Sequence, residues 1–174
     1  MRKFLIALVL VLLALPVAAQ QINLDFPDLE DRADEVVDVT LDASMLRLGA
    51  RFLRGHDPDE RAVRDMIQGL TGIYVRSYEF SKENAYDRKL ADRIKSQLGP
   101  TWKAFVTVRS KTKENVNIYA DMRGDKVVGL VIISAEPREF TVVNIVGPID
   151  IERLASLEGE FGIPRFTTRG KDHD

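Results

Sequence analysis

Four runs of strand-forming residues in the second half of the chain constrain the fold more than any other feature. They cover residues 102–110, 114–122, 126–134 and 139–147. Turn-forming pairs mark the links between them: Lys113-Glu114, Gly124-Asp125 and Glu136-Pro137. Because links this short can join only antiparallel neighbours, the runs predict a four-strand meander.

Two further strands and several helices are expected around this meander. Strand-forming composition indicates strands at residues 36–41 and 73–80. Capping residues and apolar stripes indicate a short helix after Pro27, helices over 43–54, from Pro58 to Leu70 and over 84–98, and a last helix over 150–158. This order predicts an α+β fold, an antiparallel sheet with a four-strand C-terminal meander and helices packed mainly on one face. The two earlier strands could join the meander on either side.

The first residues indicate export. Arg2 and Lys3 precede an apolar run from Phe4 to Leu15, and Val17-Ala18-Ala19 offers small residues to a signal peptidase. This run is shorter than the roughly 20 residues that span a bilayer, so we expect no stable membrane span after cleavage. The expected organisation is a signal peptide (residues 1–19), a single α+β domain (20–162) and a polar C-terminal tail (163–174). Such a protein would be periplasmic or secreted.

The composition excludes several classes of function. The chain has no cysteine, which removes disulfides, thiolate metal sites and cysteine nucleophiles. Its formal net charge is −2, so no basic surface for nucleic acid is indicated. Neither a G-x-G-x-x-G nor a G-x-x-x-x-G-K-[ST] motif is present. We therefore expect no cofactor and no nucleic-acid partner.

The two histidines are poor candidates for metal binding or catalysis. His56 lies beside Asp57 and Asp59, but this stretch also matches a helix start, with Asp57 as the N-cap. A metal site would need three or four converging ligands, and we expect none here. His173 lies in the polar tail, where a general base would not be held against a substrate.

Carboxylate catalysis is weakly indicated. Asp121 and Asp125 flank a predicted turn, and three other acids lie near the start of the predicted helix at 84–98: Glu79, Glu83 and Asp87. Acids at turns and helix starts are expected for solubility and for the helix dipole alone. We therefore expect no catalytic residues and a protein that is not an enzyme.

The alternation of residues in the meander suggests an interaction surface. We expect the helices to cover the side that carries Ala104, Val106, Val108, Val116, Ile118, Ala120 and Met122. The opposite side is more polar, yet has aromatic residues. The candidate interaction surface is Phe105, Tyr119, Arg109 and Tyr78. Basic residues of the first hairpin (Lys103, Arg109, Lys111 and Lys113) indicate a solvated edge or, alternatively, a site for an anionic envelope polymer or lipid headgroup.

The strand at residues 127–133 is apolar on both sides. Val128, Leu130 and Ile132 alternate with Val127, Val131 and Ile133. A sheet that is wet on one side would show clean alternation at this point. Residues 20–35 or 159–174 could cover the second side, or a homodimer or an envelope protein partner could do so.

Three segments resemble the bacterial family called "domain of unknown function 4252". They are SMLRLGARFL, GIYVRSYEF and the long stretch from Asn115 to Leu157. The most specific part has Glu136, Pro137, Phe140, Val143, Asn144, Ile145 and Gly147 in place. The resemblance implies an exported envelope protein with no assigned activity. Many such proteins are lipoproteins, but this chain lacks the cysteine that would accept the lipid.

Taken together, these features predict an exported, non-enzymatic envelope protein that acts by binding a protein or a ligand. The first alternative is a carrier or sensor of an apolar or lipidic ligand, held in a cavity between the sheet and the helices. The second is a carboxylate-based hydrolase, which would need two acids converging in a cleft.

Overall fold

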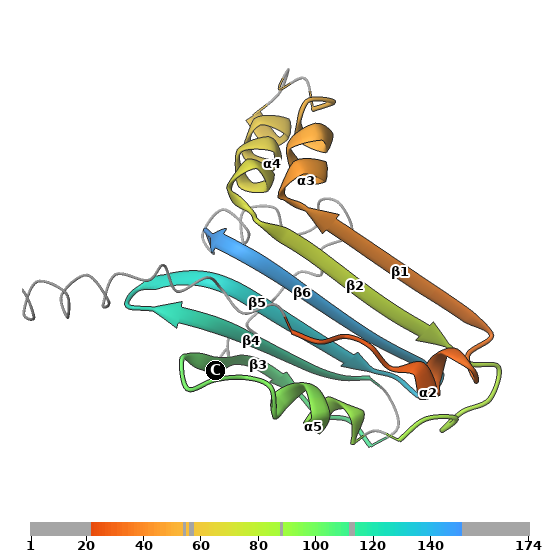
Figure 1. Cartoon of the computed structure of the whole chain (residues 1–174). Coiled ribbons are helices and arrows are strands. Elements are labelled where there is room, and N and C mark those ends of the chain that lie inside the picture. Colours follow the sequence, from red (N-terminus) through yellow and green to blue (C-terminus); the bar gives the residue numbers. More distant parts are fainter. Residues whose placement is uncertain (1–21, 54, 56–57, 88, 112–113, 151–174) are drawn as a thin grey trace, which may run out of the picture.

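The fold is a six-stranded antiparallel sheet with short helices (Figure 1). The computed structural model describes residues 22–53, 55, 58–87, 89–111 and 114–150. The strands are β1 (Glu35–Asp42), β2 (Gly72–Glu79), β3 (Trp102–Val108), β4 (Asn115–Arg123), β5 (Lys126–Ala135) and β6 (Glu139–Ile149). The helices are α2 (Pro27–Glu30), α3 (Ala43–Ala50), α4 (Pro58–Gly69) and α5 (Leu90–Lys95).

The predicted fold class and meander are confirmed. The strand order across the sheet is β1-β2-β6-β5-β4-β3, and each neighbouring pair is antiparallel. The two earlier strands join on the side of β6, because β2 pairs with the last strand from Gly72↔Val146 to Glu79↔Glu139. The expected helix at 150–158, the signal peptide and the C-terminal tail fall outside the described residues.

The helices occupy two places. In Figure 1, α2 and α5 lie in front of the sheet, whereas α3 and α4 stand together at the end of β1 and β2. Asp42 caps α3 by accepting hydrogen bonds from the N–H groups of Ser44 (2.8 Å) and Met45 (2.9 Å). The hydroxyl group of Ser44 also donates to Asp42, and this bond, followed by that from Met45, lowers the pKa of Asp42. None of the helices in the described part of the chain is long and apolar enough to cross a membrane.

We use "first face" for the side of the sheet that carries Tyr78, Val131, Ile133, Phe140 and Val142. These side chains are buried in one cluster with residues from two covering segments. The cover consists of the extended segment before α2 together with α2, which contribute Ile22, Leu24, Phe26 and Leu29, and of α5, which contributes Leu90 and Ile94.

Aromatic rings fill the centre of this cover. The ring of Phe26 meets those of Tyr78 and Phe140 edge-on, with centroid distances of 6.2 and 5.8 Å. Tyr86 stacks on Phe80 at 5.5 Å and tilts against Phe140 at 5.4 Å. The predicted self-cover of Val131 and Ile133 by residues 20–35 is therefore confirmed for Ile22 onward.

The sequence-based assignment of the covered side holds only near α3 and α4. The side with Tyr119, Val131 and Ile133 is the one under α5, and Val108 on the other side is exposed. Ala120 is nevertheless buried as predicted, in a second cluster with Leu46 of α3 and Leu70. The physical reason is that alternation separates the two sides but does not identify which one a distant segment covers.

Candidate functional site

The side of the sheet opposite α5, which we call the second face, has a centre that no helix in the described part of the chain covers. One β-branched residue from each strand lies there in a single line across the sheet, which we call the apolar row. Its members, in strand order, are Val39, Val75, Val143, Ile132, Ile118 and Val106. All six are half-buried. At a strand spacing of about 4.8 Å, this row is roughly 24 Å long.

The apolar row is bordered by a buried apolar cluster on one side and by hydroxyl groups on the other. Toward α3 and α4 lies the second cluster, which is closed by Leu46 and Leu70. On the other side lies a line of hydroxyl groups on the neighbouring sheet positions Ser77, Thr141 and Ser134. Since positions i and i+2 of a strand are about 6.7 Å apart, the open band between these boundaries is about 13 Å wide.

The hydroxyl groups are already engaged with one another and with carboxylates. Ser77 Oγ and Thr141 Oγ1 are 2.6 Å apart, and they lie 3.0 and 2.7 Å from Glu139 Oε1. One hydroxyl therefore donates to the other, which in turn donates to the carboxylate. Ser134 Oγ donates to Glu114 Oε1 at 3.0 Å. Burial and the charges of Glu114 and Glu139 raise the pKa of nearby Glu136. The apolar contact area of a molecule bound on the apolar row would therefore end at this line of hydroxyl groups.

The four residues of the candidate interaction surface do not form one surface. Phe105 is 60% exposed at an irregularity of β3 between Ala104 and Val106, and Arg109 is exposed just beyond that strand. Tyr119 is half-buried against the first-face cluster. The role of Phe105, Arg109 and Tyr119 in binding stays a prediction.

Tyr78, the fourth of these residues, lies inside the core with no exposed area. Burial raises the pKa of its hydroxyl group, and the hydroxyl oxygen has no hydrogen-bond partner. Its ring contributes to the core through Phe26.

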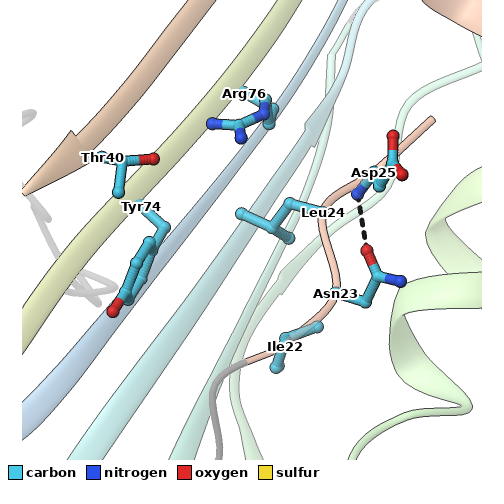
Figure 2. A pocket seen from close by; sticks show the side chains of 7 residues that line it. All are labelled: Ile22, Asn23, Leu24, Asp25, Thr40, Tyr74 and Arg76. Carbon is cyan, nitrogen blue, oxygen red and sulfur yellow. Dashed lines mark hydrogen bonds between the residues drawn. The ribbon is translucent and has the colours of Figure 1, made fainter. Parts of the chain in front are cut away.

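A groove of about 390 Å³ lies between the N-terminal segment and the strands β1 and β2 (Figure 2). Figure 2 shows Leu24 directed toward the side of Tyr74 and Arg76. Arg76 forms an ion pair with Asp38 and donates to the carbonyl of Val75 at 3.0 Å. The lining residues are Ile22, Asn23, Leu24, Asp25, Thr40, Tyr74 and Arg76. The groove is thus partly polar and open, and its guanidinium already has a partner.

Two polar side chains on the first face are buried, although the sequence did not predict burial for either of them. Asp121 and Asn144 have no exposed area. One oxygen of Asp121 accepts from Arg123 Nη2 at 3.3 Å, but the other has no partner, and neither does the amide of Asn144. An unpaired buried group of this kind costs about 1–3 kcal/mol. The signal for Asn144 was an isolated polar residue inside the apolar run of β6.

The structure brings no metal-binding cluster together among the residues it describes. His56, Asp57 and His173 fall outside them, as does the side chain of Asp59. Of the suggested carboxylate pair, Asp121 is buried beside Arg123, whereas Asp125 is exposed in the turn between β4 and β5. Glu83 lies 3.7 Å from Arg138 in an exposed ion pair.

Comparison with known proteins gives one result. The family model described as "Domain of unknown function (DUF4252)" matches residues 30–157, which is most of the chain. No curated protein and no solved structure matches the chain. The matched range contains the whole sheet. The chain therefore belongs to this family.

Proposed function

We propose that this DUF4252 protein is an exported, non-enzymatic envelope protein that acts by binding a protein partner on the second face of its sheet. The observation that carries the proposal is the apolar row, six half-buried β-branched residues in line across all six strands. Contiguous apolar surface of this kind is typical of interaction sites.

The dimensions of the band favour a slender occupant. A face roughly 24 Å by 13 Å offers about 300 Å², whereas a stable protein interface buries about 800 Å² per partner. Two sheets packed face to face would therefore need contacts beyond this band. An α-helix is about 10 Å in diameter, so an amphipathic helix of the partner fits within its width.

The chemistry of the band agrees with such an occupant. The apolar row has no charged member, and the hydroxyl line beyond it can receive the polar edge of a helix. Covering the part of each β-branched side chain that remains exposed would stabilise the complex by roughly 0.5 kcal/mol per residue.

Binding on the outside of the sheet is better supported than a carrier function. A carrier would hold its apolar ligand between the sheet and the helices, but aromatic rings pack the centre of that space at centroid distances of 5.4–6.2 Å. The groove that remains beside β1 and β2 is open and partly polar. The absence of cysteine and the presence of only two histidines support a non-enzymatic role.

Crosslinking in the exporting bacterium tests the proposal. Because the chain has no cysteine, Ile132→Cys provides a single thiol in the apolar row for a thiol-attached photocrosslinker. The matched control is Asp125→Cys in the exposed turn after β4. We expect a discrete crosslinked adduct of higher mass when the crosslinker is at position 132. The adduct should be weak or absent when the crosslinker is at position 125. It should also be lost when Val75→Lys is combined with Ile132→Cys.

Two results would contradict the proposal. One is equal labelling at positions 132 and 125, which would show that the row has no preferred partner. The other is a link from position 132 to another part of the same chain with no gain in mass, which would show that the chain covers its own second face.

A further inference from the structure

The outer side of α3 exposes a concentration of large apolar side chains. Met45 is 52% exposed, Leu48 is 54% exposed and Phe52 is 79% exposed. Met45 and Leu48 lie one turn apart on α3, and Phe52 lies in the turn that follows the helix. We call them the α3 stripe. The stripe is separate from the apolar row, whose members all lie on strands.

The local structure holds this stripe in place. Asp42 caps the helix at its start, while Leu46 and Ala50 anchor its inner side at 4% and 0% exposure. After α3 the helical turn continues, because the N–H of Phe52 donates to the carbonyl of Gly49 at 3.0 Å. The stripe therefore faces outward on an ordered element, and burial in the fold does not explain its apolar character.

Positive charge accompanies the stripe. Arg47 and Arg51 are both exposed, and the sequence has no acidic residue between Asp42 and Asp57. On the neighbouring α4 the charges are mixed, since Arg64 lies 3.5 Å from Asp65. The exposed side of α3 thus differs from α4 in carrying arginines without a neighbouring acidic residue. Arginine can keep its guanidinium at lipid phosphates while its methylene groups lie along an apolar surface.

The position of α3 suits contact with a broad surface. Figure 1 shows α3 and α4 standing at one end of the sheet, beyond the ends of β1 and β2. An element at an extremity can meet a flat surface without a clash from the sheet. A helix with exposed apolar residues and flanking arginines has the chemistry of one that lies in a bilayer interface.

From these observations we propose that α3 binds the surface of an anionic lipid bilayer, with Met45, Leu48 and Phe52 entering the interface and Arg47 and Arg51 meeting the phosphates. A stripe of three side chains on a helix of eight residues gives a reversible attachment. The expected export of the chain would bring it to an envelope membrane. The inference shares the expected export with the proposed function but does not depend on the apolar row, and it stands if no partner binds there.

Vesicle co-sedimentation of the purified protein, with its N-terminus determined by mass spectrometry, tests the inference. The probe is phosphatidylglycerol–phosphatidylcholine vesicles (1:1), compared with pure phosphatidylcholine. We expect at least tenfold tighter binding to the anionic vesicles and a steep loss of binding as salt is raised.

Paired variants identify the surface. Leu48→Ser with Phe52→Ser should lower the affinity for anionic vesicles at least tenfold, whereas Phe105→Ser with Val108→Ser, exposed on β3, should change it less than twofold. Arg47→Gln with Arg51→Gln should lower it at least fivefold, whereas Lys82→Gln with Lys126→Gln, exposed elsewhere on the protein, should not.

Three outcomes would overturn the inference. They are no binding to anionic vesicles, equal loss in the α3 and β3 variants, and a wild-type mass in solution that rises with protein concentration and falls to the monomer in Leu48→Ser/Phe52→Ser. The last outcome would assign the stripe to a second copy of the chain. Circular dichroism confirms that each variant is folded, which is expected because the substituted side chains are exposed.

Discussion

Gly147 lies so close to Leu70 that a Cβ atom on the glycine would stand 2.8 Å from the Leu70 Cα. The same atom would lie 3.0 Å from the backbone nitrogen of Thr71, whose N–H donates to the carbonyl of Val146 at 2.8 Å. Gly147 also has a φ of +130°, which side chains rarely permit. This contact fixes the end of α4 against the last strand.

Replacing this glycine should be costly. We predict that Gly147→Ala lowers the free energy of unfolding by about 3 kcal/mol or more, because it adds a backbone clash to a strained φ. The control is Gly124→Ala, where φ is +65° but nothing lies within 4 Å of the added atom; about 1 kcal/mol is expected there. Urea unfolding measures the free energy of unfolding of both variants. Equal losses would show that the backbone at Leu70 moves to accommodate the added Cβ atom.

The cover of the first face should contribute strongly to stability. Phe26→Ala removes the ring that meets Tyr78 and Phe140, and we expect a loss of about 4 kcal/mol. Phe105→Ala removes an exposed ring and should cost no more than about 0.5 kcal/mol. Chemical denaturation distinguishes the two. Similar small losses would mean that the N-terminal segment detaches from the sheet in solution.

The raised pKa of Glu136 predicts a specific pH dependence. Folding disfavours its ionised form through burial and the nearby charges of Glu114 and Glu139. Glu136 therefore does not lower the free energy of unfolding at a pH well below its ordinary pKa of 4.5, and it lowers that free energy fully at a pH above its raised pKa. Glu136→Gln should thus be more stable than the wild type at pH 7, with the difference disappearing as the pH falls to about 3.

The contribution of Asp42 to stability should have the opposite pH dependence. Hydrogen bonds from Ser44 and Met45 lower its pKa, so its contribution to stability is present above its ordinary pKa and is lost as the pH falls through the lowered value. Asp42→Ala should therefore be destabilised at pH 7 and approach the wild type in acid. Unfolding curves between pH 3 and pH 7 test both carboxylates, and parallel curves for Glu136→Gln and the wild type would contradict the first assignment.

Export predicts a defined mature N-terminus. In an exporting bacterium we expect the protein outside the inner membrane to begin at Gln20, because Ala19 is the residue before the expected cleavage. Ala19→Arg should leave the uncut form, since the peptidase requires a small residue there. Fractionation followed by mass spectrometry provides the measurement. Uncut protein in the cytoplasm of cells that express the wild type would contradict the prediction.

The strands could be predicted closely from the sequence, because their signals are local. Alternating residues and turn pairs such as Gly124-Asp125 placed β4 and β5 close to their observed bounds. The helix expected over 84–98 is shorter and begins at Leu90. Asn84 has a φ of +58° and donates its N–H to the carbonyl of Pro137 at 2.9 Å, so the chain is held in a turn before the helix.

The candidate site was harder to predict, because it depends on contacts between distant segments. Tyr78 and Tyr119 lie under a cover that comes from the start of the domain and from α5. A signal for that cover was present in the alternation of Ile22, Leu24 and Phe26 with Asn23 and Asp25. The apolar row required the register of all six strands, which no local pattern supplies.

The place of β6 has a consequence for when this protein can fold. The last strand lies between β2 and β5, so the hairpin of β1 and β2 is attached to the meander only through it. A chain that is still being synthesised or threaded through a membrane cannot complete the sheet before residues 139–149 are available. Contacts of long sequence separation also form slowly. The topology thus delays completion of the sheet until its last strand is present.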